Sequence, residues 1–221
     1  MMRLFHLLQP PLPLIPNPDE PRDYPLGRWN LYVGCGKNPA PGYVNIDLFP
    51  AAGVDAIADA ELMPFRANVF QRIECDAVLE HVRCPEQVIR EIARVLAPGG
   101  YAHLVTPFCH PFHEHPRDYR RFTPDGLKLL LGSDLVVVAE GWRTGPTATL
   151  LVFVLEYVKL WFPWRFWRGG VHFVLGWLLF PFRYLDYFFF RSSSAGRLGN
   201  HLFLWLRKGG DSLEKAASTQ Y

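Results

Sequence analysis

The sequence has little cysteine, little net charge and no strongly basic stripe, and each of these shortages excludes a class of protein. The four cysteines form no CxxC pair and no paired zinc spacing; they are Cys35, Cys75, Cys84 and Cys109. Such scattered cysteines are typical of reduced thiols, so we expect no disulfides and a cytoplasmic protein. A net charge of +2 is too small to indicate nucleic-acid binding.

The sequence also has no apolar run long enough to predict a transmembrane helix. The longest uncharged stretch of its aromatic C-terminal part, residues 169–182, has fourteen residues, whereas a span needs about 18 or more. Residues 1–29 begin with a short apolar run that breaks into prolines, without the core and cleavage site of a signal peptide. We interpret them as an ordered or semi-ordered lead-in.

With 221 residues, of which 49% are hydrophobic, the chain is large enough for one domain with a substantial core. Short apolar runs alternate with polar, helix-forming stretches, which predicts a parallel sheet covered by helices. The expected strands are 30–33, 44–46, 54–58, 72–75, 101–105, 135–139 and 201–206. A helix is expected over 85–96, stopped by Pro98-Gly99-Gly100, and another after Thr123 with Leu127, Leu130 and Leu131 on its buried side.

Two features do not fit a regular alternation. Only ten residues, 34–43, separate the first two strands, whereas a parallel crossover usually needs a dozen or more. We therefore expect the first helix to be absent or one turn long. The fourth strand carries Arg72 and Glu74 at alternate positions, so either these side chains pair with each other's neighbours or one face of the sheet is wet.

The most informative stretch is NLYVGCGKNPAPGYVNID, residues 30–47. Gly34 and Gly36 lack a Cβ atom and let a ligand approach the backbone, and Asp47 ends the second strand, where a carboxylate can accept hydrogen bonds from a ribose. This arrangement suits an adenosyl nucleoside. An ordinary glycine turn is the alternative for the GCG motif alone.

Four segments, in this order and spacing, resemble the class I S-adenosylmethionine-dependent methyltransferases, in particular their small type 11-like branch. They are LYVGCG followed by NID, DAIADAELMPF (55–65), FQRIECDAVLEHV (70–82) and IARVLAPGGYAHLVTP (92–107). The resemblance covers roughly residues 29–140. It implies an α/β fold with a Rossmann-like, mostly parallel seven-stranded sheet, helices on both faces, and S-adenosyl-L-methionine as cofactor.

The resemblance also implies nine cofactor-binding residues, which are Gly34, Cys35, Gly36, Asp47, Asp59, Ala60, Cys75, Asp76 and His81. In the family the glycine loop passes beneath the methionyl part and the ribose, and the matching carboxylates bind the ribose and the adenine amino group. For His81 a structural hydrogen bond is the alternative. Two positions differ from the family: Tyr32 stands where many members have an acidic residue, and Gln71 replaces another.

The segment from Cys109 to Leu127 is the richest in groups that could act on an acceptor. His113 or Tyr119 could remove a proton if the acceptor needs a base. Three arginines could bind an anionic part of the acceptor; they are Arg117, Arg120 and Arg121.

Two alternatives stay open for this segment. Asp118 and the arginines could form an ion-pair brace for the following helix. Three histidines, His110, His113 and His115, could also be metal ligands, although their crowding in a proline-rich loop is unlike known sites, and we predict no metal site.

Residues 146–191 form an aromatic segment that holds 16 of the 33 aromatic residues. Because residues 150–162 are apolar almost all round, we expect them to bury most of their surface. In one hypothesis, the segment enters one leaflet of a membrane from its inner face and admits a lipid-linked or hydrophobic small-molecule acceptor. In the other, it completes the core or a homodimer surface.

The sequence thus predicts five regions: a lead-in (1–29), a cofactor-binding core (30–145), a helical insert (146–195), a last strand (196–208) and a disordered tail (209–221). The predicted activity is methyl transfer by in-line displacement. The alternative is a non-catalytic cofactor-binding or scaffold protein of a membrane-associated assembly.

Overall fold

The computed structural model describes residues 15–114, 116–192 and 194–209. Residues 1–14 of the predicted lead-in, His115, Ser193 and the tail after residue 209 therefore lie outside the described residues. The chain divides into two compact units. The insert unit contains residues 15–20, 109–112 and 142–201, apart from 193, and the sheet unit contains residues 21–108, 113–141 and 202–209, apart from 115.

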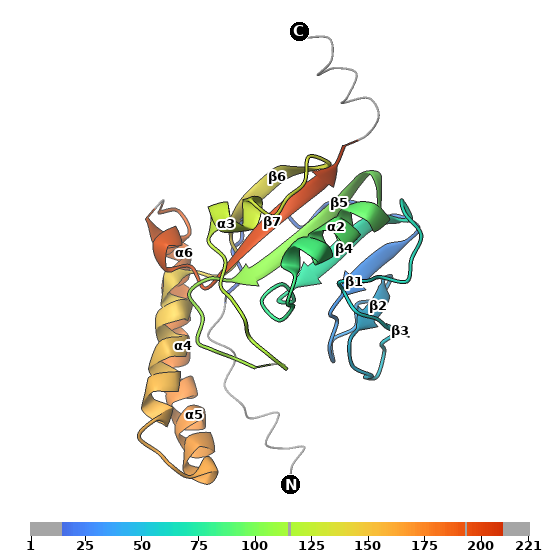
Figure 1. Cartoon of the computed structure of the whole chain (residues 1–221). Helices are drawn as coiled ribbons and strands as arrows, with labels where there is room; N and C mark the ends of the chain where they lie inside the picture. Colours follow the sequence, from blue (N-terminus) through green and yellow to red (C-terminus); the bar gives the residue numbers. More distant parts are fainter. Residues whose placement is uncertain (1–14, 115, 193, 210–221) are drawn as a thin grey trace. The chain divides into compact units, whose positions relative to one another are not determined.

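The sheet has seven strands in the order β3-β2-β1-β4-β5-β7-β6 (Figure 1). They are β1 Asn30–Val33, β2 Val44–Asp47, β3 Ala56–Ile57, β4 Phe70–Asp76, β5 Leu96–Pro107, β6 Leu135–Trp142 and β7 His201–Lys208. The pairs β1–β2, β1–β4, β2–β3 and β4–β5 are parallel, whereas β7 runs opposite to β5 (Figure 1). The predicted mostly parallel seven-stranded sheet is confirmed.

Two strands have limits that the sequence pattern did not predict. β3 keeps only two of its five expected residues, because it pairs with β2 alone at the sheet edge. β5 begins at Leu96 instead of residue 101, since Leu96 already pairs with Phe70 across a register shift. The glycine turn predicted over 98–100 is thus part of the strand, with Gly99 at a φ of 77°.

The crossover between β1 and β2 contains no helix over residues 34–43, all of which are described, as its length predicted. Two asparagine side chains hold it instead. Asn30 donates to the carbonyl of Gly42 (3.0 Å), and the Asn45 side chain accepts from the amide of Ala40 (2.8 Å). Because these side chains satisfy backbone groups that a helix would otherwise pair, a short irregular link can carry the cofactor loop.

The polar residues of β4 form an ion-pair group on one face of the sheet. Arg72 and Glu74 approach to 2.7 Å, and Glu74 is also 2.7 Å from Nδ1 of His103 on β5. The ring of His103 stacks on Trp205 at 4.2 Å, and Tyr24 covers Trp205 at 4.4 Å. This face of the sheet is not wet: Arg72 and Glu74 pair directly with each other, and Glu74 also pairs with His103, beneath aromatic side chains.

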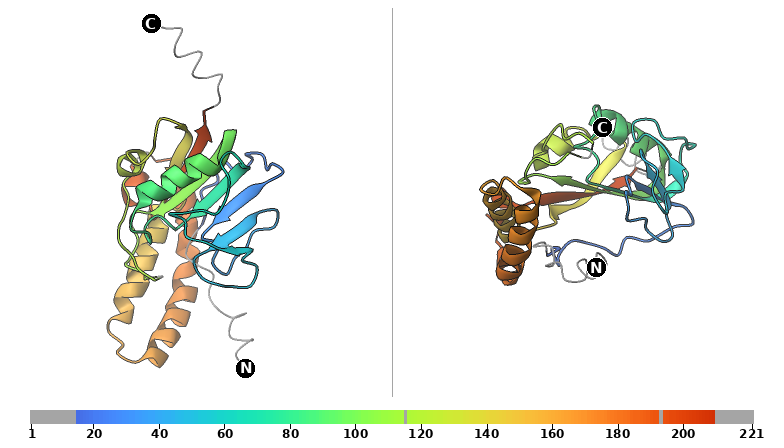
Figure 2. Two further views of the ribbon diagram at one scale, coloured as in Figure 1. Left: turned by 45° about the vertical axis from the view of Figure 1, so that its right-hand side comes forward. Right: turned by 90° about the horizontal axis from the view of Figure 1, so that it is seen from below.

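Two helices of the sheet unit, α2 (Pro85–Val95) and α3 (Pro124–Lys128), lie on the same side of the sheet (Figure 2). α2 buries the apolar stripe expected of it, including Val88 and Ile92. α3 begins as predicted, with the Thr123 side chain accepting from the amide of Gly126 at 3.0 Å. It has only one and a half turns, so Leu127 alone is fully buried and Leu130 and Leu131 are half-buried.

The insert unit is built around a pair of helices, α4 (Pro146–Lys159) and α5 (Arg165–Leu179), which lie side by side (Figure 2). They are followed by η1 (Phe180–Leu185), α6 (Asp186–Phe189) and η2 (Ala195–Leu198). The carboxylate of Asp186, fully buried, accepts from the amides of Thr147 (2.7 Å) and Ala148 (3.0 Å) at the start of α4.

The insert unit exposes much of its apolar surface, so the chain by itself does not bury most of the surface of residues 150–162. α4 buries little more than one stripe, including Leu151 and Leu155, while Leu160 and Trp161 are 74% and 71% exposed. Within the described part of the chain, no helix is long and apolar enough to cross a membrane.

Candidate functional site

The main pocket of the sheet unit opens at the carboxyl ends of β1, β2 and β4. Open α/β sheets bind their ligands at this edge. The pocket is lined by Val33, Gly34, Gly36, Ile46, Asp47, Leu48, Phe49, Ala58, Asp59, Ala60, Ala77, Val78, His81, Val82 and Pro116. Six of the nine cofactor-binding residues predicted from the resemblance are among them.

Two glycines shape the first wall of the pocket, for different reasons. Gly34 has a φ of 70°, and a Cβ atom there would lie 2.3 Å from a methyl group of Val78. Gly36 has a φ of 56°, and a Cβ atom there would point into open space. Gly34 therefore allows the loop to pack against Val78, whereas Gly36 leaves the backbone bare where it borders the pocket.

Asp47 closes the glycine loop from the end of β2. Its Oδ2 accepts from the amide of Gly36 at 2.8 Å, and its Oδ1 accepts from the amide of Phe49 at 2.9 Å. Each carboxylate oxygen can accept a second hydrogen bond. Asp47 is thus fixed by the backbone and still able to bind two hydroxyl groups of a ligand.

Asp59 and Ala60 form the wall that follows β3. The Oδ1 of Asp59 accepts from the amide of Glu61 at 2.8 Å, which orients the carboxylate, and Asp59 and Leu62 form an isolated antiparallel bridge. Both Asp59 and Ala60 line the pocket. A carboxylate beside a backbone amide can bind a ring that presents a donor and an acceptor side by side.

Three of the predicted cofactor-binding residues do not line the pocket: Cys35, Cys75 and Asp76. The two cysteines are buried, and burial raises the pKa of both thiols. After Asp76 the chain turns through Ala77, whose φ of 55° is unusual for a residue with a side chain. Ala77 itself lines the pocket, so the bend brings the backbone after β4 to the site.

The apolar part of the lining is what sequence reasoning missed. Leu48 and Phe49 follow directly after Asp47, and Val78 and Val82 lie four residues apart after β4. Their signal was present, since they flank predicted ligand-binding residues. Apolar residues are ordinary in the core, however, and only the fold shows that these four face a pocket.

The two departures from the family have structural roles here. Gln71 accepts from the amide of Trp29 at 2.8 Å, so this position still makes a hydrogen bond with the chain before β1. Tyr32 packs edge-to-face against Tyr43 at 6.3 Å and does not line the pocket.

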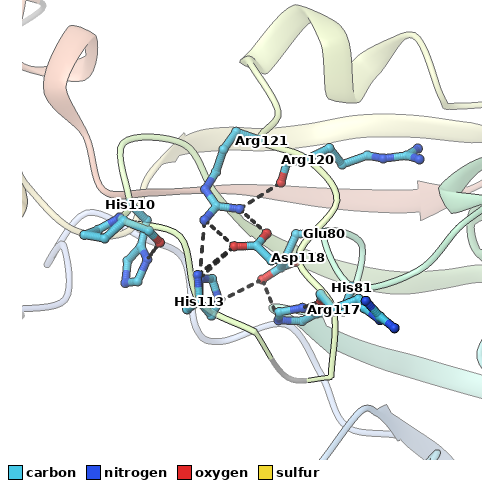
Figure 3. A network of polar contacts seen from close by, with 9 residues as sticks. Glu80, His81, His110, His113, Arg117, Asp118, Arg120 and Arg121 are labelled. Atoms are coloured by element: carbon cyan, nitrogen blue, oxygen red, sulfur yellow. Dashed lines mark hydrogen bonds and ion pairs between the residues drawn. The ribbon is translucent and has the colours of Figure 1, made fainter.

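The segment from Cys109 to Leu127 contains an ion pair with two short contacts. Arg121 contacts both carboxylate oxygens of Asp118, whose side chain is almost fully buried (Figure 3). The hydrogen bond from Arg121 lowers the pKa of Asp118 to about 2. Arg120 donates to the carbonyl of Arg83 at 2.9 Å. Arg121 thus forms the ion-pair brace with Asp118 that was the alternative to binding an anionic part of the acceptor.

The two predicted catalytic residues are near the pocket wall and not among its lining. His113 packs edge-to-face against His81 at 5.0 Å. The amide of Tyr119 donates to the carbonyl of Glu80 at 2.8 Å, and its side chain is 44% exposed. A role for either in proton removal stays a prediction.

Glu80, which no sequence pattern indicated, lies between His81 and His113 (Figure 3). Its Oε1 is 3.7 Å from Nε2 of His81 and 3.9 Å from Nε2 of His113. Glu80 is fully buried, and this burial raises its pKa to about 8. Groups with a shifted pKa gather at functional sites, and His81, the neighbour of Glu80, lines the pocket.

Comparisons with known proteins agree with this geometry. Residues 31–104 match the family model described as a methyltransferase domain. No curated protein sequence matches the chain. Among solved structures, a protein from Bacillus halodurans that is described as a methyltransferase is 16% identical with a TM-score of 0.54, over 85% of this chain and 95% of that one.

Two further solved structures share the fold. The [4+2]-cyclase SpnF is 17% identical with a TM-score of 0.54, over 94% of this chain and 81% of that one. Phosphoethanolamine N-methyltransferase 2 from Haemonchus contortus is 14% identical with a TM-score of 0.54, over 85% of this chain and 50% of that one. At these identities the likeness concerns the fold, and the family match concerns the segment that builds the pocket. Residues 31–104 therefore resemble a methyltransferase domain, and the chain has the fold of these solved structures.

Proposed function

We propose that the chain binds S-adenosylmethionine in the pocket of the sheet unit and transfers its methyl group to a hydrophobic or lipid-linked small molecule. The observation that carries the first part is the pocket itself, in which Asp47 and Asp59 border a glycine loop. The Haemonchus contortus relative was solved with S-adenosylhomocysteine, the product of methyl donation.

The residues fit this cofactor. The carboxylate of Asp47 has acceptor capacity left for the two ribose hydroxyls, and Asp59 with the amide of Ala60 suits the amino group and a ring nitrogen of adenine. Gly36 leaves the space that a side chain would fill. When bound, the cofactor supplies an activated methyl group, and the protein's share is to hold an acceptor in line with it.

The nature of the acceptor is argued from the insert unit. Its helices expose large aromatic and aliphatic side chains; among them are Leu150, Phe153, Tyr157, Leu160, Trp161, Trp164 and Trp177. Exposed apolar surface of this extent is typical of a binding or membrane surface. Tryptophan is also enriched where proteins meet the lipid headgroup region. We therefore propose that the insert unit touches a membrane peripherally.

A second candidate function has an observation in its favour. The cyclase SpnF has the same fold, so the fold by itself does not entail methyl transfer. A chain that binds the cofactor without donating its methyl group would act as a scaffold.

The proposal is tested by calorimetric titration of the full chain with S-adenosylhomocysteine. We expect micromolar binding by the wild type and a loss of about 10- to 100-fold in Asp47→Ala and Asp59→Ala, because each variant removes hydrogen bonds to a charged group. Asp134→Ala, a carboxylate outside the pocket lining, is the matched control and should bind like the wild type.

The acceptor is tested with methyl-labelled cofactor and a membrane extract. Label that enters the organic-solvent fraction supports a lipid-linked or hydrophobic acceptor, and label that stays in water-soluble products contradicts it. Cofactor binding without any transfer favours the scaffold. If the wild type does not bind S-adenosylhomocysteine, the methyltransferase function is wrong for this chain.

A further inference from the structure

Glu80, His81 and His113 form a cluster that the methyl-transfer proposal does not use. One ligand atom from each lies within 4.8 Å of the others. The distances from Oε1 of Glu80 to the two Nε2 atoms, 3.7 and 3.9 Å, are too long for hydrogen bonds. They are close to the spacing of about 3.4 Å between two ligands that each lie about 2.1 Å from one tetrahedral ion.

Glu80 needs a partner that the described residues do not supply. Its side chain is fully buried, and neither carboxylate oxygen has a hydrogen-bond partner in the described part of the chain. An unpaired charge in such a place costs several kcal/mol, so a buried carboxylate either takes up a proton or binds a cation. The position of the two imidazoles favours the cation.

Both imidazoles are oriented by oxygen atoms on their outer side (Figure 3). Nδ1 of His81 contacts the carbonyl of Arg117, and Nδ1 of His113 lies 3.4 Å from Oδ2 of Asp118. The same Oδ2 accepts from the amide of His113 at 2.8 Å. Metal-binding histidines usually have an oxygen partner of this kind, which fixes the ring and directs Nε2 toward the ion.

The positive charge beside His113 is already neutralised. Arg121 lies 3.4 Å from Nδ1 of His113, but its guanidinium binds both oxygens of Asp118. The guanidinium therefore adds little repulsion against a cation on the inner side of the cluster.

We propose that Glu80, His81 and His113 bind a divalent transition-metal ion of the zinc class. Two nitrogen ligands and one carboxylate suit such an ion and leave at least one coordination position for water or another ligand. Since His81 also lines the pocket, the ion would lie at the pocket wall, where it can bind an oxygen of an acceptor. This set differs from the histidine triple weighed in the sequence, with which it shares only His113.

The test uses the full chain, freed of metal with a chelator and titrated with Zn²⁺ and with Co²⁺, without cofactor. We expect one equivalent of ion per chain, visible absorption bands for Co²⁺, and a rise in unfolding temperature with Zn²⁺. His81→Ala and His113→Ala should weaken binding about 100-fold or more and lose the rise.

A double variant, His110→Ala with His115→Ala, is the matched control, because it removes two histidines of the same segment and should keep wild-type affinity. If the wild type binds no stoichiometric ion, or if the control loses binding while His113→Ala keeps it, the proposed site is wrong.

Glu80→Gln keeps the shape of the side chain and removes its charge. The proposal expects weaker Zn²⁺ binding together with metal-free stability equal to or above that of the wild type, because glutamine carries no charge that burial would penalise. A loss of metal-free stability with unchanged Zn²⁺ affinity would give Glu80 a purely structural role and overturn the proposal. Because no cofactor is present, these results do not depend on the proposed methyl transfer.

Discussion

At the scale of single residues, the ion-pair group of β4 makes the free energy of unfolding depend on pH. Burial alone would raise the pKa of Glu74, but the hydrogen bond and charge of His103, together with Arg72, outweigh it and lower this pKa below its ordinary value. A carboxyl group whose pKa is lowered by folding stabilises the protein above its unfolded pKa of about 4.5. That contribution is lost as the pH falls through the lower, folded pKa.

We therefore predict that Glu74→Gln is less stable than the wild type at pH 7, by about 1–3 kcal/mol, and that the difference shrinks below about pH 4.5. Urea denaturation at a series of pH values measures this. Glu156→Gln, which changes an exposed glutamate, should show a difference near zero throughout. A difference for Glu74→Gln that stays constant with pH would contradict a stabilising role for its charge.

Single residues of the site were predictable where a backbone requirement or a family motif names them. Gly34, Gly36 and Asp47 follow from the GCG motif and the strand after it, and all three line the pocket. Glu80 was not predictable, although it stands beside His81 in the sequence. Its importance comes from complete burial and from the approach of His113, and neither leaves a local pattern.

At the scale of elements, the start of α4 depends on a side chain from elsewhere in the chain. Gly145, the N-cap residue, has no side chain to accept from the first amides of the helix. Asp186, some forty residues later, supplies both acceptors and packs so closely that a Cβ atom on Gly145 would lie 2.5 Å from its carboxyl carbon. A carboxylate at a helix N-terminus also interacts favourably with the helix dipole.

We predict that Asp186→Ala destabilises α4 by about 1–3 kcal/mol, since two buried amides lose their acceptor. Hydrogen exchange of the amides over residues 146–155 should accelerate, while the amides of α2 stay unchanged. Uniform acceleration over both helices would instead indicate global unfolding, and no acceleration would mean that the cap has no effect.

Elements whose apolar residues recur at a regular spacing were predictable from the sequence. Strands whose limits depend on pairing with a neighbouring strand were not. The limits of α2 agree with its apolar stripe and proline start to within a residue. The early start of β5 and the shortness of β3 depend on which neighbour each strand has in the sheet. A sequence window does not contain that neighbour.

At the scale of the whole molecule, the exposed apolar side chains of the insert unit predict attachment to lipid. We expect the full chain to sediment with anionic vesicles and much less with neutral ones, because the segment 146–191 also carries five Lys or Arg against two acids. Trp161→Ala with Trp164→Ala should weaken this partition about tenfold or more, because each removes a large exposed ring.

Leu62→Ala with Leu129→Ala is the control, since these exposed side chains belong to the sheet unit. Wild-type protein that stays in the supernatant with both kinds of vesicle would exclude the membrane. A concentration-dependent increase in sedimentation coefficient that the tryptophan variant abolishes would identify a second copy of the chain as the occupant of this surface.

The close approach of Gly34 to Val78 restricts which residues can replace this glycine. A larger residue at position 34 would meet the Val78 methyl group and would also have to adopt a φ of 70°, two independent penalties. Shortening Val78 relieves only the first. Shortening Val78 alone therefore cannot rescue a replacement of Gly34 by a larger residue, because the backbone penalty at this φ remains.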